Sequence, residues 1–188
     1  MKIAVLAVQG AFAEHIDRIR KLGVDCVELR QAADLERSFD GLILPGGEST
    51  VQGKLLRELH MIATLRDRIR EGIPVLGTCA GLILLAEKIV DEEHTYLGTL
   101  PVRVKRNAYG RQLGSFHTEQ EMKGIGTVPM TFIRAPYVEA AGDGVDTLAS
   151  VDGKIAAVRY VNQIGIAFHP ELDADDRIHK LFLSLCGE

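Results

Sequence analysis

Short apolar runs alternate with amphipathic stretches along the first half of the chain. Runs at residues 2–8, 24–30, 40–45 and 73–78 have the apolar content expected of buried strands. The stretches between them, residues 13–23, 49–60 and 61–72, place apolar side chains at helical spacing. This order predicts an α/β protein with a mostly parallel central sheet, helices on both faces, and functional loops at the carboxyl ends of the strands.

The pattern changes from about residue 95. Extended pieces broken by turns cover residues 96–107, 111–120, 128–136 and 155–170, and they predict antiparallel additions to the same core. A closing helix follows, with Ile178, Leu181, Phe182 and Leu185 on one face. Because no repeat, low-complexity tract or linker divides the chain, we expect residues 1–188 to form one domain.

Charge and cysteine usage narrow the classes of function. The net charge is −4, and no run of Lys or Arg could follow a phosphate backbone, so we expect no nucleic-acid partner. The three cysteines are widely spaced, which argues against a disulfide framework or a zinc site and favours the cytoplasm. The opening apolar run is interpreted as a strand rather than a signal peptide, and no run approaches the roughly 18 residues of a membrane span.

Cys79 lies where one apolar run stops and the next begins, in Gly77-Thr78-Cys79-Ala80-Gly81. Small neighbours on both sides are typical of a nucleophile elbow, a sharp turn from strand to helix. The following helix, predicted over 82–89, would favour the thiolate at its N-terminus, and the Ala80 N–H would face an oxyanion. The alternative is a buried cysteine that acts as a small hydrophobe, which is our interpretation of Cys26 and Cys186.

His169 and Glu171 are the candidate partners of this thiol. Pro170 favours an extended His169, and in a continuing strand the two side chains would project to the same side. A carboxylate can then fix the tautomer of the imidazole. His15, His60 and His179 are interpreted as solvated or locally bonded, and His117 is the other histidine that could lie near a site.

The loop Leu44–Leu56 contributes paired glycines at the end of a predicted strand. Such glycines allow close approach to a ligand, and the Gly47 N–H is a candidate second donor for an oxyanion. A plain tight turn capped by Ser49 is the alternative.

Three motifs together, G-T-C-A-G, P-G-G-E-S-T and H-P-E, form the constellation of class I glutamine amidotransferases. The longer strings VQGAFAEH, LPGGEST, GTCAGLILLA, KRNAYGRQ, FIRAP and FHPEL resemble the glutaminase subunits of pyridoxal 5′-phosphate synthases over nearly the whole chain. Val51, Gln52, Gly114 and His117 depart from that family's pattern, which puts details of the partner surface or of activation in doubt.

The resemblance implies a three-layer, flavodoxin-like fold and a glutaminase. Cys79, His169 and Glu171 would form the triad that converts L-glutamine to L-glutamate and ammonia through a thioester, with Gly47 and Ala80 as the oxyanion hole. A separate (β/α)₈-barrel subunit would take up the ammonia, make pyridoxal 5′-phosphate and raise the glutaminase activity on docking. That phosphate is a product, so we expect no cofactor and no metal. The residues that would bind glutamine are Gly47, Glu48, Ser49, Arg106, Ile133 and Arg134.

Two other classes of protein share parts of this pattern. A cysteine-dependent α/β hydrolase would carry the same elbow, but its acid usually precedes the histidine along the chain. A thiol-based stress or redox protein would need the cysteine without the His169-Pro170-Glu171 segment.

Overall fold

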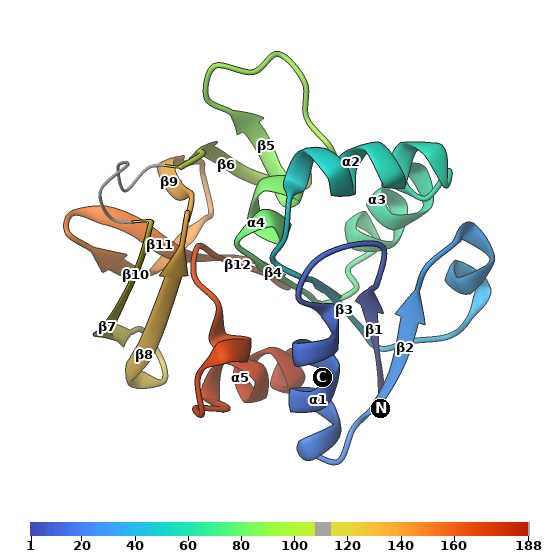
Figure 1. Ribbon diagram of the computed structural model, residues 1–188, viewed down its shortest axis with the longest axis horizontal. Helices are drawn as coiled ribbons and strands as arrows, with labels where there is room; N and C mark the ends of the chain where they lie inside the picture. Colours follow the sequence, from blue (N-terminus) through green and yellow to red (C-terminus); the bar gives the residue numbers. More distant parts are fainter. Residues whose placement is uncertain (108–113, 188) are drawn as a thin grey trace.

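The parallel half of the central sheet is built from the first half of the chain and one late strand (Figure 1). The computed structural model describes residues 1–107 and 114–187. Strands β2, β1, β3, β4 and β12 lie in that order, and each neighbouring pair runs parallel. Their bounds are β1 Lys2–Leu6, β2 Asp25–Leu29, β3 Gly41–Leu44, β4 Val75–Thr78 and β12 Gln163–Ile166.

The second half of the chain extends this sheet beyond β12. Antiparallel pairing joins β12 to β11, β11 to β9 and β9 to β6, while β10 pairs with β11 and β5 runs parallel to β6. Strands β7 and β8 form a separate antiparallel hairpin. The bounds are β5 Ala86–Ile89, β6 Leu100–Lys105, β7 Ser115–Met122, β8 Gly126–Ile133, β9 Tyr137–Ala141, β10 Asp146–Val151 and β11 Lys154–Tyr160.

Helices cover both faces of the parallel half (Figure 1). On one face lie α1 and α5; a Cβ added to Gly41 of β3 would lie 2.5 Å from Sγ of Cys186 in α5, so the two elements are in direct contact. The remaining α-helices lie on the other face, and α4 packs on β3 and β4. The bounds are α1 Phe12–Lys21, η1 Ala32–Glu36, α2 Ser49–Glu58, α3 Ile62–Arg70, α4 Ala80–Leu85, η2 Pro170–Leu172 and α5 Arg177–Cys186.

The predicted fold class is confirmed, but local predictions need correction. The helix predicted over 82–89 ends at Leu85, and residues 86–89 form β5 instead. Because every residue of α4 is buried, its sequence does not alternate between apolar and polar faces. The pattern alone therefore cannot distinguish a buried helix from a buried strand. Strands β9 and β10 were not predicted, because their sequences alternate weakly between apolar and polar residues. No helix within the described part of the chain is long and apolar enough to cross a membrane.

Candidate active site

Cys79 occupies a sharp turn between β4, which ends at Thr78, and α4, which begins at Ala80. Its φ of 50° and ψ of −100° form a strained conformation of the kind that is retained at functional sites. Glycine is required on both sides, because a Cβ at Gly81 would lie 1.9 Å from the Leu44 carbonyl oxygen and one at Gly77 would lie 2.9 Å from the Gly81 carbonyl. The sequence therefore folds into an elbow that presents the thiol at the carboxyl end of a parallel strand.

His169 and Glu171 follow β12, the strand beside β4 in the sheet. Nδ1 of His169 lies 2.7 Å from Oε1 of Glu171, and an interaction with the Cys79 thiol contributes to the raised pKa of His169. The expected reason for this pairing was wrong: β12 ends at Ile166, and Glu171 lies in the 3₁₀-helix η2 rather than in a continuing strand. The backbone is held instead by the N–H of His169, which donates to the Thr131 carbonyl of β8 at 2.8 Å.

The charges of these groups depend on one another. Burial alone would lower the pKa of His169, but its hydrogen bonds to Cys79 and Glu171 prevail and raise the pKa to about 10. Burial would likewise raise the pKa of Glu171, yet nearby His15 and His169 hold it below its usual value. His169 is therefore an imidazolium at neutral pH, flanked by the thiol and by a carboxylate.

The other two cysteines have different surroundings. Burial raises the pKa of Cys26 to about 11 and that of Cys186 to about 12. Neither residue lines the cavity at Cys79. Their thiols are therefore un-ionised at neutral pH, as expected of cysteines that serve as small hydrophobes.

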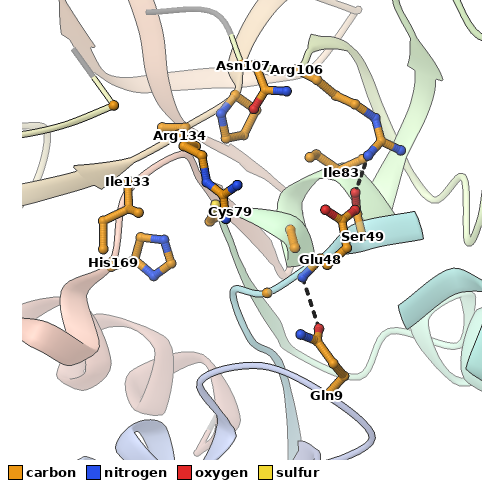
Figure 2. A pocket seen from close by; sticks show the side chains of 15 residues that line it. Gln9, Glu48, Ser49, Cys79, Ile83, Arg106, Asn107, Ile133, Arg134 and His169 are labelled. Carbon is orange, nitrogen blue, oxygen red and sulfur yellow. Dashed lines mark hydrogen bonds between the residues drawn. The ribbon is translucent and has the colours of Figure 1, made fainter. Parts of the chain in front are cut away.

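A cavity of about 770 Å³ opens over Cys79 (Figure 2). Cys79, Ala80 and His169 lie in its wall, and the residues that the resemblance assigned to glutamine binding line it as well: Gly47, Glu48, Ser49, Arg106, Ile133 and Arg134. The sequence did not predict the further lining residues Gln9, Ile83, Asn107, Gly114, Ala135 and Pro136. Gln9 could have been found, because it follows β1 at the carboxyl end of a parallel strand.

The glycine loop after β3 is fixed by hydrogen bonds on both sides. The Gly46 N–H donates to Oγ1 of Thr78 at 2.9 Å, and the Gly46 carbonyl accepts from the Ala11 N–H at 2.9 Å. In a trans peptide, the N–H of Gly47 then points away from Ala11. A Cβ at Gly46 would lie 2.4 Å from Cε1 of His169, so the loop packs directly on the imidazole.

Side chains from α2 and from the loop after β1 complete this arrangement. Gln9 accepts the Glu48 N–H at 2.9 Å, and Nε2 of Gln52 donates to the carbonyl oxygens of Gln9 and Pro45 at 3.0 and 3.2 Å. Glu48, rather than Ser49, caps α2, since its Oε1 accepts the Thr50 N–H at 3.1 Å. Gln52, one of the departures from the family pattern, thus holds the loop that carries Gly47.

Arg106 reaches the cavity from the end of β6. Its guanidinium donates to the Ser49 hydroxyl, pairs with Glu92 at 2.5 Å and donates to the Tyr96 hydroxyl at 3.1 Å. Gly53 makes room for Tyr96, because a Cβ there would lie 1.9 Å from the ring. Arg106 is therefore held in place over the N-terminus of α2.

Two histidines that were interpreted as solvated or locally bonded have other surroundings. His15 and His179 are fully buried, and they bond to each other across the fold next to Glu171. Nothing in the local pattern of either helix indicated that these helices pack together. His117 is exposed, bonds to Thr131 at 2.9 Å and does not line the cavity. Residues 108–112 of the string KRNAYGRQ lie outside the described residues.

This combination of sheet and elbow places the protein among the glutamine amidotransferases. A solved crystal structure of a glutamine amidotransferase superposes on it with a TM-score of 0.94, at 43% identity over 99% of each chain. The chain belongs to the SNO glutamine amidotransferase family, which it matches over residues 5–188.

Curated relatives are similar over almost their full lengths. Pyridoxal 5′-phosphate synthase subunit PdxT of Desulfitobacterium hafniense is 62% identical over 97% of this chain and 92% of the relative. The subunit of the same name from Streptococcus pneumoniae is 52% identical over 100% of this chain and 99% of the relative. The crystal structure of a putative GMP synthase subunit from Thermoplasma acidophilum shares the fold, with a TM-score of 0.70 at 20% identity over 100% of this chain and 94% of the other.

Proposed function

We propose that this chain hydrolyses L-glutamine to L-glutamate and ammonia, and that the ammonia passes to a separate synthase subunit that makes pyridoxal 5′-phosphate. One observation carries the chemistry: the strained Cys79 lines the same cavity as His169, and Nδ1 of His169 faces the buried carboxylate of Glu171. The names of the relatives support the biosynthetic role.

In the first half of the reaction, the Cys79 thiolate attacks the side-chain amide carbon of glutamine. A C–S bond forms, and the carbonyl oxygen becomes an oxyanion that accepts hydrogen bonds from the N–H groups of Gly47 and Ala80. The imidazolium of His169 then gives its proton to the nitrogen as the C–N bond breaks. Ammonia leaves, and a γ-glutamyl thioester remains on Cys79.

In the second half, neutral His169 takes a proton from water, which attacks the thioester. A second oxyanion forms at the same two N–H groups. Its collapse breaks the C–S bond, releases glutamate and restores the thiolate beside the imidazolium. Glu171 orients His169 in both halves and stabilises its charged form.

Recognition of glutamine follows from the charges that line the cavity. The guanidinium groups of Arg106 and Arg134 suit the α-carboxylate, because their planar forks make paired hydrogen bonds. The carboxylate of Glu48 suits the α-ammonium group. Gly47, Ser49 and Ile133 supply the remaining contacts.

The partner is a (β/α)₈-barrel synthase subunit that combines the ammonia with phosphorylated sugars. Docking at the mouth of the cavity is supported by Ile133, which is apolar and 38% exposed at that rim. The cytoplasm suits an enzyme whose nucleophile is a free thiol.

The test is release of glutamate from L-glutamine by the purified chain, alone and mixed with a barrel subunit of pyridoxal 5′-phosphate synthase. Turnover that rises on mixing and disappears in Cys79→Ala supports the proposal. Cys26→Ala is the matched control, because Cys26 does not line the cavity and its loss should leave turnover unchanged. A stable complex without glutamate release would refute the glutaminase assignment.

A further inference from the structure

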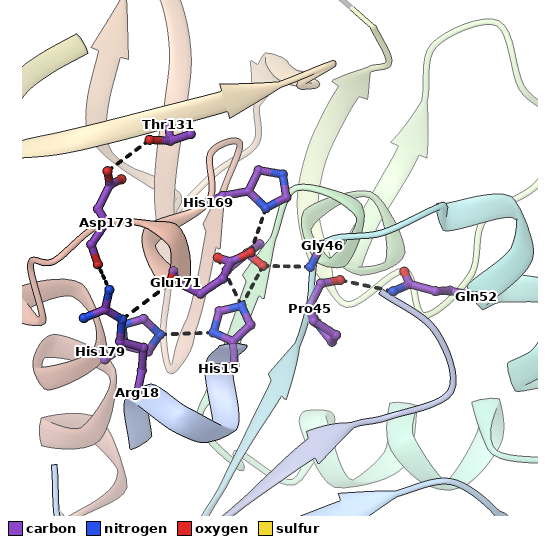
Figure 3. A network of polar contacts seen from close by, with 11 residues as sticks. His15, Arg18, Pro45, Gly46, Gln52, Thr131, His169, Glu171, Asp173 and His179 are labelled. Atoms are coloured by element: carbon purple, nitrogen blue, oxygen red, sulfur yellow. Dashed lines mark hydrogen bonds and ion pairs between the residues drawn. The ribbon is translucent and has the colours of Figure 1, made fainter. Parts of the chain in front are cut away.

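A cluster of buried polar side chains lies next to Glu171, on the side opposite His169 (Figure 3). Nε2 of His15 is 3.4 Å from Oε2 of Glu171 and 3.1 Å from Oγ1 of Thr78. Nδ1 of His15 lies 3.0 Å from Nε2 of His179. His15 comes from α1 and His179 from α5, and neither side chain has any exposed surface.

The second oxygen of Glu171 needs a proton donor. Oε1 faces His169, but Oε2 is buried and has no hydrogen bond of good geometry within the described residues. A buried carboxylate oxygen without a donor is costly. Among the described ion pairs, the group facing this oxygen is Nε2 of His15.

The tautomer of His15 can be assigned from its partners. A proton on Nδ1 would point to His179, would leave a buried Nδ1–H donor of His179 unpaired, and would set a bare Nε2 against the carboxylate. A proton on Nε2 instead faces Thr78 and Glu171, while Nε2–H of His179 donates to Nδ1 of His15. The second arrangement leaves only an acceptor, Nδ1 of His179, without a partner.

We propose that His15 is a positioning residue of the active site, an inference that rests on the proposed glutaminase function. Its Nε2–H faces Oε2 of Glu171, keeps this carboxylate ionised and holds Oε1 toward His169. His179 fixes the tautomer of His15. The reacting thiol is thus supported through a chain of contacts from Cys79 to His169, Glu171, His15 and His179.

The backbone around Glu171 is held by the same helix. Arg18, one turn after His15 on α1, donates to the carbonyl oxygens of Glu171 and Asp173. Thr78, the residue before Cys79, accepts the N–H of Gly46 and contacts His15. Other charged groups around the cluster are Glu14 on α1 and Asp176 at the start of α5. One cluster therefore connects the elbow, the glycine loop and the carboxylate.

The test compares two substitutions of His15. His15→Gln keeps an N–H near the position of Nε2. His15→Leu removes the donor and introduces an apolar side chain of moderate volume. The matched control is His60→Asn, because His60 is exposed, lies at the junction of α2 and α3, and has a φ of 55° that asparagine tolerates.

The first measurement is the rate of Cys79 alkylation by iodoacetamide as a function of pH. The slow reaction of Cys26 and Cys186, whose pKa values are raised by burial, is subtracted with Cys79→Ala. The upper midpoint of the profile reports loss of the His169 proton beside the thiolate, and we expect His15→Leu to move this midpoint about one pH unit downward, because a weakened Glu171 stabilises the imidazolium less. His15→Gln and His60→Asn should leave the midpoint in place.

The second measurement is glutaminase kinetics in the complex with the barrel subunit. His15→Leu should lower kcat by about tenfold or more with little change in KM, and His15→Gln should recover most of kcat. Added to Glu171→Gln, His15→Leu should cause no further loss, because it acts through that carboxylate. Alkylation requires no glutamine, so a wild-type chain without glutaminase activity would refute the proposed function and leave this test intact.

Three results would overturn the inference: an unchanged profile in His15→Leu, equal impairment in a folded His15→Gln, or losses that add to those of Glu171→Gln. Should His15→Leu fail to fold, NMR of the wild-type chain with ¹⁵N-labelled histidine reports the tautomer directly. A proton on Nε2 of His15 at neutral pH is the expected result, and a proton on Nδ1 refutes the arrangement.

Discussion

Nδ1 of His169 lies 2.7 Å from Oε1 of Glu171, and both side chains are less than 10% exposed. A hydrogen bond of this kind places a proton on Nδ1 and leaves Nε2 to face the thiol. Because desolvation offsets much of the attraction between the two charges, the buried pair adds little to the stability of the fold, but it fixes the geometry of the imidazole. The value of Glu171 to the protein therefore lies in orientation and charge.

Replacement of the Glu171 carboxylate tests its roles in orienting His169 and in stabilising the charged imidazole. In Glu171→Gln, the amide no longer stabilises the imidazolium and allows the wrong tautomer of His169. We expect kcat for glutamate release to fall by about 100-fold or more with KM nearly unchanged. Steady-state kinetics in the complex with the barrel subunit give both values. Glu119→Gln, at an exposed position on β7, is the control, and an equal loss there would contradict a specific role of Glu171.

Gly46 tests how closely the glycine loop packs on the triad. Its backbone φ is not positive, so alanine is tolerated by the chain, but the new Cβ would lie 2.4 Å from Cε1 and 2.9 Å from Nδ1 of His169. We expect Gly46→Ala to displace the imidazole, to lower kcat by about 100-fold and to cost about 1–3 kcal/mol of stability. Glutamate release and urea unfolding measure the two effects.

The control for that substitution is Gly187→Ala, whose Cβ would meet no described residue more closely than Met1, at 3.5 Å. It should behave as the wild type in both measurements. Normal turnover in Gly46→Ala would show that the loop moves freely and does not position His169.

The sequence predicted those parts of the site that depend on local rules. The elbow at Cys79 follows from the small residues around it, and the parallel β-α-β order places it at a strand end. The buried cluster could not be predicted in this way: His15 and His179 are 164 positions apart, and only the packing of α1 and α5 brings them together. The pairing of His169 with Glu171 was predicted, but it is produced by a 3₁₀-helix rather than by a strand.

Arg106 tests recognition of the substrate apart from the chemistry. Arg106→Lys keeps the charge but loses the planar fork that reaches Ser49, Glu92 and Tyr96. We expect KM for glutamine to rise about tenfold, with kcat within about twofold of the wild type. Arg103→Lys is the control, since that arginine pairs with Glu139 on the exposed side of β6. A loss confined to kcat would instead place Arg106 in the chemical step.

The two neutral histidines behind the triad make the stability of the fold depend on pH. Burial, with a smaller effect of nearby His15, lowers the pKa of His179 to about 3, and burial lowers the pKa of His15 as well. The unfolded chain, with a histidine pKa near 6.5, then binds more protons than the folded chain between about pH 6.5 and pH 3. The contribution of these two histidines to the free energy of unfolding is fully present above pH 6.5 and is lost as the pH falls through this window.

His169 and Glu171 do not obscure this effect between pH 6.5 and 4.5. The raised pKa of His169 contributes stability that is constant below pH 6.5, and the lowered pKa of Glu171 contributes stability that is lost only below about pH 4.5. Urea unfolding at intervals across this range should therefore show a steady loss, with each fully buried neutral histidine contributing up to about 1.4 kcal/mol per pH unit. His179→Gln, which cannot be protonated, should flatten the slope by one histidine, while His60→Asn should leave it unchanged. An unaltered slope in His179→Gln would mean that His179 is already charged in the folded protein, which would contradict its assignment as a buried neutral histidine.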